Sequence, residues 1–216
     1  MTLEVKDLNS VRGGRPVFSG LDFRVAAGEL VVVRGPNGSG KSSLLRLVAG
    51  FLQPAAGDIL WDATRISEDR PAHGSRTSYV GHLDAIKPVL TVEENLLFWA
   101  GLEQGPTGNE ERITAALEKL GLAGQADLPA GYLSAGQKRR LNLARLAVCP
   151  RALWLLDEPT ATLDDRSARA VSEMIEEHCA GGGMALVATH LDLELLAATE
   201  LNLDQYLARP QLELVT

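Results

Sequence analysis

The chain has 216 residues with a net charge of −7, and 45% of its residues are hydrophobic. This length allows one large domain with its own core, and the acidic balance argues against a general nucleic-acid binder, which needs a basic face. Cys149 and Cys179 are isolated in the sequence, which favours buried thiols in a reducing compartment over a zinc or redox pair. No run of about 18 apolar residues is present, so we expect a chain that does not span a membrane by itself.

The N-terminal part contains the short apolar or alternating runs that are typical of β-strands. The runs predicted as strands are residues 3–5, 21–25, 30–33 and 57–61. The third run is uniformly apolar and β-branched, as expected of a strand buried on both faces. It leads directly into a glycine-rich segment, after which residues 42–49 predict a helix that ends at Gly50.

The glycine-rich segment, residues 35–42, has the spacing G-x-x-x-x-G-K-S of a phosphate-binding loop and is called the phosphate loop below. Its glycines allow backbone N–H groups to turn toward phosphate oxygens, and the following helix adds the positive end of its dipole. Lys41 supplies a charge, and the Ser42 hydroxyl suits Mg²⁺. An ordinary turn has no need of a lysine and a hydroxyl here. We therefore expect nucleotide phosphates to bind at Gly35, Pro36, Asn37, Gly38, Ser39, Gly40, Lys41, Ser42 and Ser43.

From residue 92 onward the hydrophobic period becomes helical. Helices are predicted at 92–100, 110–120 and 137–148. Buried-strand runs return at 153–156 and 184–189, with a further helix at about 167–178 between them. The pattern predicts an α/β core that is interrupted by a helical insertion at roughly 85–147.

Two acidic residues, Asp157 and Glu158, directly follow the apolar run 153–156. The strand would deliver both carboxylates to the sheet edge at which open α/β folds bind ligands. Asp157 is suited to hold Mg²⁺ through water, and Glu158 to orient or deprotonate the water that attacks a terminal phosphate. Taken alone, the pair could equally cap the turn before Pro159. Together with the phosphate loop, the pair predicts a nucleotide hydrolase.

The segment L-S-A-G-Q at residues 133–137 has two interpretations. Ser134 and Gln137 stand at the spacing of a helix capping box. Ala135 and Gly136 are small, which a cap does not require, and small residues at a helix start leave N–H groups open to a phosphate. Both interpretations can hold together. The basic run that follows, residues 138–140, is either a solvated face or a source of positive potential near a nucleotide.

In this order, the elements resemble the ATP-binding-cassette (ABC) ATPase family over nearly the whole chain. The family motifs fall on the phosphate loop, on residues 133–137 (the signature segment), on Asp157 with Glu158, on the loop 161–164, and on His190. The resemblance implies an α/β fold in a single domain over 1–216. Its P-loop nucleotide-binding core would comprise 1–84 and 148–216, with an N-terminal antiparallel β portion, and its inserted helical signature subdomain would comprise 85–147.

The resemblance also implies a chemistry and an assembly. ATP and Mg²⁺ would be the cofactors, with Ser42 and Asp157 as metal ligands and with Glu158 and His190 as catalytic residues. Two subunits would form a head-to-tail homodimer with shared ATP sites. The residues of one subunit that would close over the ATP held by the phosphate loop of the other are Ser134, Ala135, Gly136 and Gln137.

Two positions depart from the usual pattern of the family. Arg12 stands where an aromatic residue commonly stacks on adenine, and a guanidinium can also stack on a base. His82 stands where a glutamine usually senses Mg²⁺. Because imidazole is a poor magnesium ligand, we expect His82 to contact at most a metal-bound water.

Within the family, residues 18–21, 79–82 and 90–96 together with Ala135 resemble the ATP-binding subunits of haem exporters in cytochrome c biogenesis. That resemblance implies a peripheral subunit on the cytoplasmic face of the bacterial inner membrane, bound to integral-membrane transporter subunits and linked indirectly to a haem chaperone. ATP would drive haem export or release of the haem-loaded chaperone. The sequence contains no C-x-x-C-H haem-attachment motif.

Three alternatives stay open at this point. The chain could serve an exporter of another substrate. It could be an ABC ATPase outside transport, although those commonly carry two cassettes or a long coiled-coil insertion. It could also be a P-loop kinase or GTPase, for which the signature segment and His190 would have no role.

Overall fold

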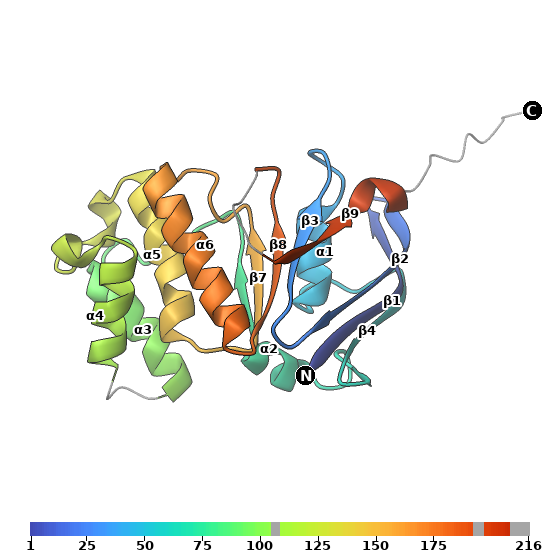
Figure 1. The fold of residues 1–216 in the computed structure, drawn as a ribbon, viewed down its shortest axis with the longest axis horizontal. Helices are drawn as coiled ribbons and strands as arrows, with labels where there is room; N and C mark the ends of the chain where they lie inside the picture. Colours follow the sequence, from blue (N-terminus) through green and yellow to red (C-terminus); the bar gives the residue numbers. More distant parts are fainter. Residues whose placement is uncertain (105–108, 192–196, 208–216) are drawn as a thin grey trace, which may run out of the picture.

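Two β-sheets organise the chain in the computed structural model, which describes residues 1–104, 109–191 and 197–207 (Figure 1). The antiparallel sheet has the order β2-β1-β4-β5, from β1 (Thr2–Arg12), β2 (Arg15–Ala26), β4 (Ala56–Trp61) and β5 (Thr64–Arg65). β1 and β2 extend beyond the runs predicted for them because Gly13 and Gly14, with φ of 55° and 74°, close the two strands into a hairpin.

The second sheet is parallel, with the order β6-β7-β8-β3-β9. Its centre is formed by β3 (Leu30–Arg34), β7 (Leu153–Asp157) and β8 (Met184–Ala188), which are buried almost throughout, as their apolar runs predict. The edge strands β6 (Thr77–Val80) and β9 (Ala198–Asn202) escaped prediction because half or more of their residues are at least partly exposed. Because the strands are parallel, the carboxyl ends of β3, β7 and β8 meet at one edge.

Helix α1 (Lys41–Val48) lies between the two sheets. Its residues Leu44, Leu45 and Leu47 share one hydrophobic cluster with residues of β1 and β2 and with residues of the parallel sheet. A further helix, α2 (Arg70–Arg76), was not predicted, and the Asp69 side chain caps it by accepting from the N–H of Ala72 at 3.0 Å. The position of α1 holds the phosphate loop at the edge of the parallel sheet where β3 ends.

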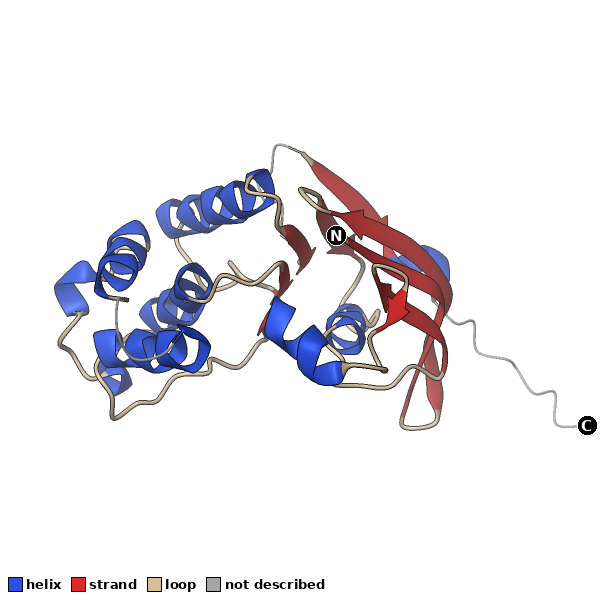
Figure 2. Cartoon of the chain, turned by 90° about the horizontal axis from the view of Figure 1, so that it is seen from below, coloured by secondary structure: helices blue, strands red, loops and turns tan. Residues whose placement is uncertain are grey.

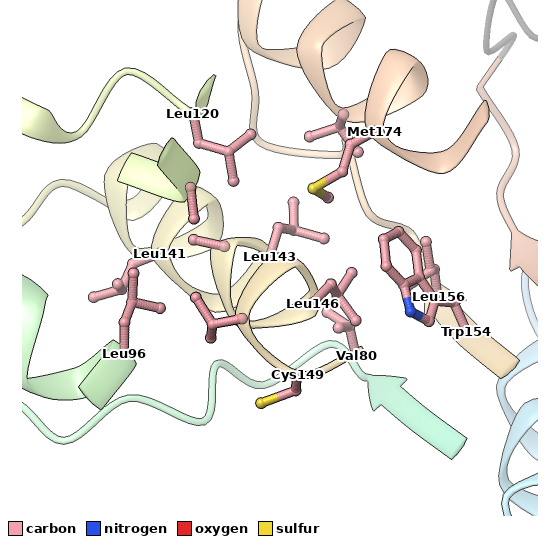
Figure 3. Close-up of a cluster of buried hydrophobic side chains, with 14 of the residues drawn as sticks. Val80, Leu96, Leu120, Leu141, Leu143, Leu146, Cys149, Trp154, Leu156 and Met174 are labelled. Carbon is pink, nitrogen blue, oxygen red and sulfur yellow. The ribbon is translucent and has the colours of Figure 1, made fainter. Parts of the chain in front are cut away.

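The helices α3 (Val92–Gln104), α4 (Glu110–Lys119) and α5 (Ala135–Val148) pack together at the end of the molecule opposite the antiparallel sheet (Figures 1 and 2). Helix α6 (Asp165–Ala180) packs against β8, while α5 itself contacts β6. Figure 3 shows the cluster that joins these helices to the sheet, with Leu96, Leu120, Leu141, Leu143, Leu146, Trp154, Leu156 and Met174 among its members. The predicted α/β fold class, with antiparallel strands at the N-terminus, is confirmed.

Three short 3₁₀ turns complete the described chain, at Ala123–Gln125, Ala130–Tyr132 and Leu203–Tyr206. Cys149 and Cys179 are buried and form no disulfide in the described chain, as expected of reduced thiols, and burial raises the pKa of the Cys179 thiol to about 11. Within the described ranges, no helix has the length and apolar character needed to cross a bilayer. The division into a core and a helical subdomain at 85–147 stays a prediction.

Candidate nucleotide-binding and hydrolysis site

The phosphate loop joins the end of β3 to the start of α1, and its three glycines all have positive φ: 149° at Gly35, 87° at Gly38 and 99° at Gly40. A Cβ at Gly40 would lie 2.5 Å from Val17 Cγ1, so packing against β2 excludes any larger residue. At Gly38 a Cβ would meet nothing within 4 Å. The loop is therefore closed toward the protein and open on its outer side, as a cradle for a phosphate requires.

Lys41 begins α1 and is 7% exposed. Its Nζ donates to the carbonyl oxygens of Gly35 at 2.7 Å and of Pro36 at 3.1 Å, so the ammonium lies inside the loop. The N-cap of α1 is Gly40, which offers no capping side chain. No side chain at the N-cap therefore accepts from the first N–H groups of α1. The positive end of this helix adds to the charge of Lys41.

The end of β7 places Asp157, which is 3% exposed, and then Glu158 at the same sheet edge. Glu158 has a φ of 48°, a left-handed conformation that costs a non-glycine residue about 1–2 kcal/mol. Its Oε1 lies 2.9 Å from Nδ1 of His190, just past the end of β8, while its Oε2 is buried and has no hydrogen-bond partner among the described residues. Strained backbone of this kind persists at sites where the surroundings hold it in place.

These elements border one cleft of about 460 Å³, called the nucleotide cleft below. Lys41, Ser42 and Ser43 line it on the side of α1, and Asp157, Glu158 and His190 line it on the side of the parallel sheet. His82 and Arg12 line it as well, together with the loop residues Asn37, Gly38 and Gly40. The structure therefore brings together most of the predicted phosphate-binding, metal-binding and catalytic residues, and both departures from the family pattern face the same space.

The signature segment lies outside the nucleotide cleft of its own chain, since none of its residues lines that cleft. Ser134 caps α5 by a reciprocal pair of bonds: its Oγ accepts from the N–H of Gln137 at 3.2 Å, and its own N–H donates to Gln137 Oε1 at 2.8 Å. The capping-box interpretation is confirmed. A Cβ at Gly136 would lie 3.2 Å from the Thr162 carbonyl, which explains the small residue there. Contact of this segment with a phosphate stays a prediction.

The basic run 138–140 contains the functional candidate that the sequence did not single out. Arg139 is 5% exposed, and its guanidinium bonds the backbone carbonyls of Asp157, Glu158, Pro159 and Gly81. Arg140 donates to the carbonyls of Leu120 and Gly121 at the end of α4. A solvated face is thus wrong for Arg139, whereas Arg140 stays partly exposed. Three adjacent basic residues usually lie on a surface, and only the tertiary contacts reveal that the second is buried.

The residues of the nucleotide cleft fit a nucleoside triphosphate with Mg²⁺. Lys41 and the start of α1 supply positive charge for phosphates, and the Ser42 and Ser43 hydroxyls line the same space. Among the described residues, no group of three or more His, Cys, Asp or Glu side chains forms a metal site by itself. Proteins commonly hold Mg²⁺ through one or two side chains together with substrate phosphates and water, and Ser42 and Asp157 in the cleft are the residues that could do so.

The fold and this cleft define a P-loop nucleotide-binding domain of the ABC type. The family model described as ABC transporter matches residues 18–161, and the chain belongs to that family. A putative ABC transporter ATP-binding protein from Pyrococcus furiosus has a similar structure, with a TM-score of 0.85 at 25% identity over 96% of this chain and 100% of that one.

Two sequence relatives give a closer comparison. The chain is 51% identical to the cytochrome c biogenesis ATP-binding export protein CcmA of Paramagnetospirillum magneticum, over 98% of each chain. It is also 51% identical to the protein of the same name from Rhodospirillum rubrum, over 95% of this chain and 87% of the relative. The chain is thus an ATP-hydrolysing subunit of the ABC transporter type.

Proposed function

We propose that this chain is the ATP-hydrolysing subunit of an exporter that acts in cytochrome c biogenesis, where ATP drives haem export or release of a haem-loaded chaperone. The observation that carries the proposal is the nucleotide cleft, in which a phosphate loop, two carboxylates and a histidine from separate parts of the chain line one space. The shared identity of 51% with two export proteins of cytochrome c biogenesis gives the biological setting.

In the proposed reaction, Lys41 and the N–H groups at the start of α1 bind the β- and γ-phosphates. Ser42 and Asp157 would hold Mg²⁺, which neutralises the negative charge that builds up on the phosphate oxygens. Water attacks the γ-phosphorus, and the bond from that phosphorus to the bridging oxygen of ADP breaks. Glu158, which lines the nucleotide cleft, accepts the proton of the attacking water at its carboxylate.

His190 would orient the base. Its Nδ1 lies 2.9 Å from Glu158 Oε1, so the imidazole donates to the carboxylate when Nδ1 carries the proton. This bond fixes the orientation of the Glu158 carboxylate at the cleft. The His190 ring is 54% exposed and lines the nucleotide cleft, a position from which it can also reach the terminal phosphate.

The signature segment completes the site in a homodimer. In one chain it lies outside the nucleotide cleft, and Ser134 and Ala135 are exposed. A second copy in head-to-tail orientation would place these residues over the ATP of its partner. The helical subdomain at 85–147 would then move its signature segment toward the partner's phosphate loop when both sites are filled.

Membrane partners would bind beside the helical subdomain. The side chains of Leu83 and Val89 are 86% and 87% exposed, and Phe51, at 65%, packs edge-to-face on Tyr79. A groove of about 350 Å³ runs from Phe51 and Tyr79 to Trp99 on α3. Apolar surface next to the loop of His82 suits an integral-membrane transporter subunit, which would hold the chain on the cytoplasmic face of the inner membrane.

The test is complementation in a bacterium that lacks its own copy of the gene. Wild-type chain should restore haem-stained c-type cytochromes, whereas Glu158→Gln should not, even though it is produced at the same level. Leu83→Ser with Val89→Ser should release the chain from the membrane fraction while ATP binding stays intact. Full complementation by Glu158→Gln would refute a role for hydrolysis. A wild-type chain that is held at the membrane without restoring cytochromes would point to another exported substrate.

A further inference from the structure

The buried guanidinium of Arg139 joins three segments that lie far apart in the sequence. Arg139 is on α5, shortly after the signature segment. Its Nη2 donates to the carbonyls of Asp157 at 2.7 Å and Glu158 at 2.9 Å, its Nε donates to Pro159 at 3.2 Å, and its Nη1 donates to Gly81 at 2.7 Å. These contacts tie α5 to the turn after β7 and to the loop after β6.

All the donors of this side chain have acceptors. A guanidinium carries five N–H groups, and besides the four carbonyls the Nη1 atom reaches Asp84 Oδ1 at 3.5 Å. A buried charge is tolerated only when its hydrogen bonds are satisfied in this way. Lysine has three donors on a single nitrogen and cannot reach five acceptors spread around a plane. The site is therefore built for arginine in particular.

Glu158 is the residue on which this arrangement acts most directly. Its backbone is held on both sides: the N–H donates to the Ala188 carbonyl at 2.8 Å, and the carbonyl accepts from Arg139. Its φ of 48° is in the left-handed region, which is unfavourable for a non-glycine residue unless several contacts hold the backbone there. Loss of the Arg139 bonds would free the turn to relax and would move the carboxylate away from His190.

The second target is the loop that carries His82. Arg139 bonds the Gly81 carbonyl on one side of this histidine and the Asp84 carboxylate on the other, and Asn142 Nδ2 donates to the same Asp84 Oδ1 at 3.0 Å. Both anchors come from α5, the helix that the signature segment begins. A shift of α5 would therefore reach the Glu158 turn and the His82 loop through one side chain.

We propose that Arg139 is a positioning residue for ATP hydrolysis: it holds the Glu158 turn and the His82 loop in register with α5, and it acts on the chemical step while nucleotide binding stays unchanged. The proposal rests on the role proposed above for Glu158. Arg139 touches only backbone carbonyls and Asp84 in the bonds described here, so its effect on catalysis passes through these two segments.

The test uses the full chain, free and in its membrane complex, with Arg139→Gln, Arg139→Lys and the control Arg140→Gln. Arg140 lies on the same helix as Arg139, but its two hydrogen bonds, at 2.9 and 3.2 Å, go to backbone carbonyls at the end of α4 and not toward the cleft. Arg140→Gln removes these two bonds. Both Arg139 variants should lower kcat about 10- to 100-fold, with KM and ATP affinity within about threefold of wild type. Arg140→Gln removes fewer and more exposed bonds, so it should lower the Tm less than Arg139→Lys does and keep kcat within about twofold.

A double-mutant cycle separates positioning from general destabilisation. If Arg139 acts through Glu158, adding Arg139→Gln to Glu158→Gln lowers the residual kcat little further. Independent, multiplied losses would overturn the proposal, and so would an Arg139→Lys variant with wild-type kcat or one that changes only KM. An active Glu158→Gln would refute the assignment of the base and this inference together. An inactive Glu158→Gln beside an active Arg139→Gln would refute the inference alone.

Discussion

Glu158 and Lys41 occupy the same cleft but have different environments, so their removal should affect different steps. In Glu158→Gln the amide oxygen can still accept a bond but cannot accept the proton of the attacking water. We expect ATP to bind normally, turnover to fall about 10²- to 10⁴-fold, and an ATP-bound dimer to accumulate. Lys41→Ala removes the charge within the phosphate loop and should weaken nucleotide binding. Equilibrium binding and single-turnover hydrolysis of both variants make the comparison, and normal turnover in Glu158→Gln would rule it out as the base.

His82 is exposed, and it faces the nucleotide cleft from a loop that α5 holds at Gly81 and Asp84. We expect His82→Ala to keep nucleotide affinity within about threefold and to lower the hydrolysis that the membrane partners stimulate. His82→Gln should preserve more of this stimulation, because an amide oxygen can also bond a metal-bound water. The measurement is ATPase activity with and without the partners. Equal stimulation in wild type, His82→Ala and His82→Gln would leave this residue a packing role only.

Most of the residues at the candidate site could be predicted because they lie in short, contiguous sequence motifs. The phosphate loop is such a motif, and Asp157 and Glu158 follow an apolar run that forms the buried strand β7. Arg139 has no such signal. Its importance comes from four carbonyls that chain folding brings to it, and neither propensity nor spacing encodes a contact of that kind.

At the scale of elements, prediction succeeded where burial is complete and failed where it is partial. β3, β7 and β8 have apolar runs because both faces are covered, and α6 shows the helical period of one buried face. β6 and β9 pair with a neighbour on one side only, so their sequences are mixed. The short α2 contains Pro71 and Gly74, which weaken any helical signal.

The start of α5 carries the prediction at this scale. Gly136→Asp adds a negative charge and a side chain whose Cβ would lie 3.2 Å from the Thr162 carbonyl. Monomers should still bind ATP, because the phosphate loop is unchanged, but dimer closure and hydrolysis should fail. Gly136→Ala adds the same Cβ without charge and serves as the matched control, so a milder loss there isolates the effect of the charge.

Mixed dimers test whether the sites are shared. A dimer with Lys41→Ala in one subunit and Gly136→Asp in the other retains one intact composite site, so it should hydrolyse ATP when neither parent homodimer does. Activity is measured after the two chains are co-expressed with different affinity tags and purified in tandem. Mixed dimers no more active than their parents would contradict a site formed across the interface.

For the whole molecule, two hydrophobic clusters meet at the parallel sheet, one on the side of α1 and the antiparallel sheet and one on the side of the helices. Arg12, His82 and His190 converge on the nucleotide cleft only because these layers are stacked in this order. The sequence marks each residue through resemblance to a family, but it does not fix how the hairpin of β1 and β2 packs over the loop. The close approach of Gly40 to Val17 is a consequence of that packing.

The same layers bury His73, which is 2% exposed and whose Nε2 lies 2.7 Å from the Val48 carbonyl. Burial, with a smaller contribution from Arg76, lowers the pKa of His73 below its ordinary value of 6.5, so the folded chain keeps this ring neutral while the unfolded chain protonates it. The contribution of His73 to the free energy of unfolding should therefore be complete above pH 6.5. It should decline as the pH falls from 6.5 to the lower pKa of the folded state. For one group, the slope is at most about 1.4 kcal/mol per pH unit.

His73→Gln tests this pH dependence, because the amide can donate to Val48 but does not titrate. Urea unfolding at pH 7.5 and 5.5 should show a smaller loss of stability in the variant than in wild type, even if the variant is less stable at both values. Between pH 7.5 and 8.5, where the histidine is neutral in both states, the two proteins should change in parallel. The His178 pKa is also lowered by burial, so the variant should keep part of the acid dependence. If wild type and His73→Gln lose the same stability between pH 7.5 and 5.5, burial of the neutral ring does not set this behaviour.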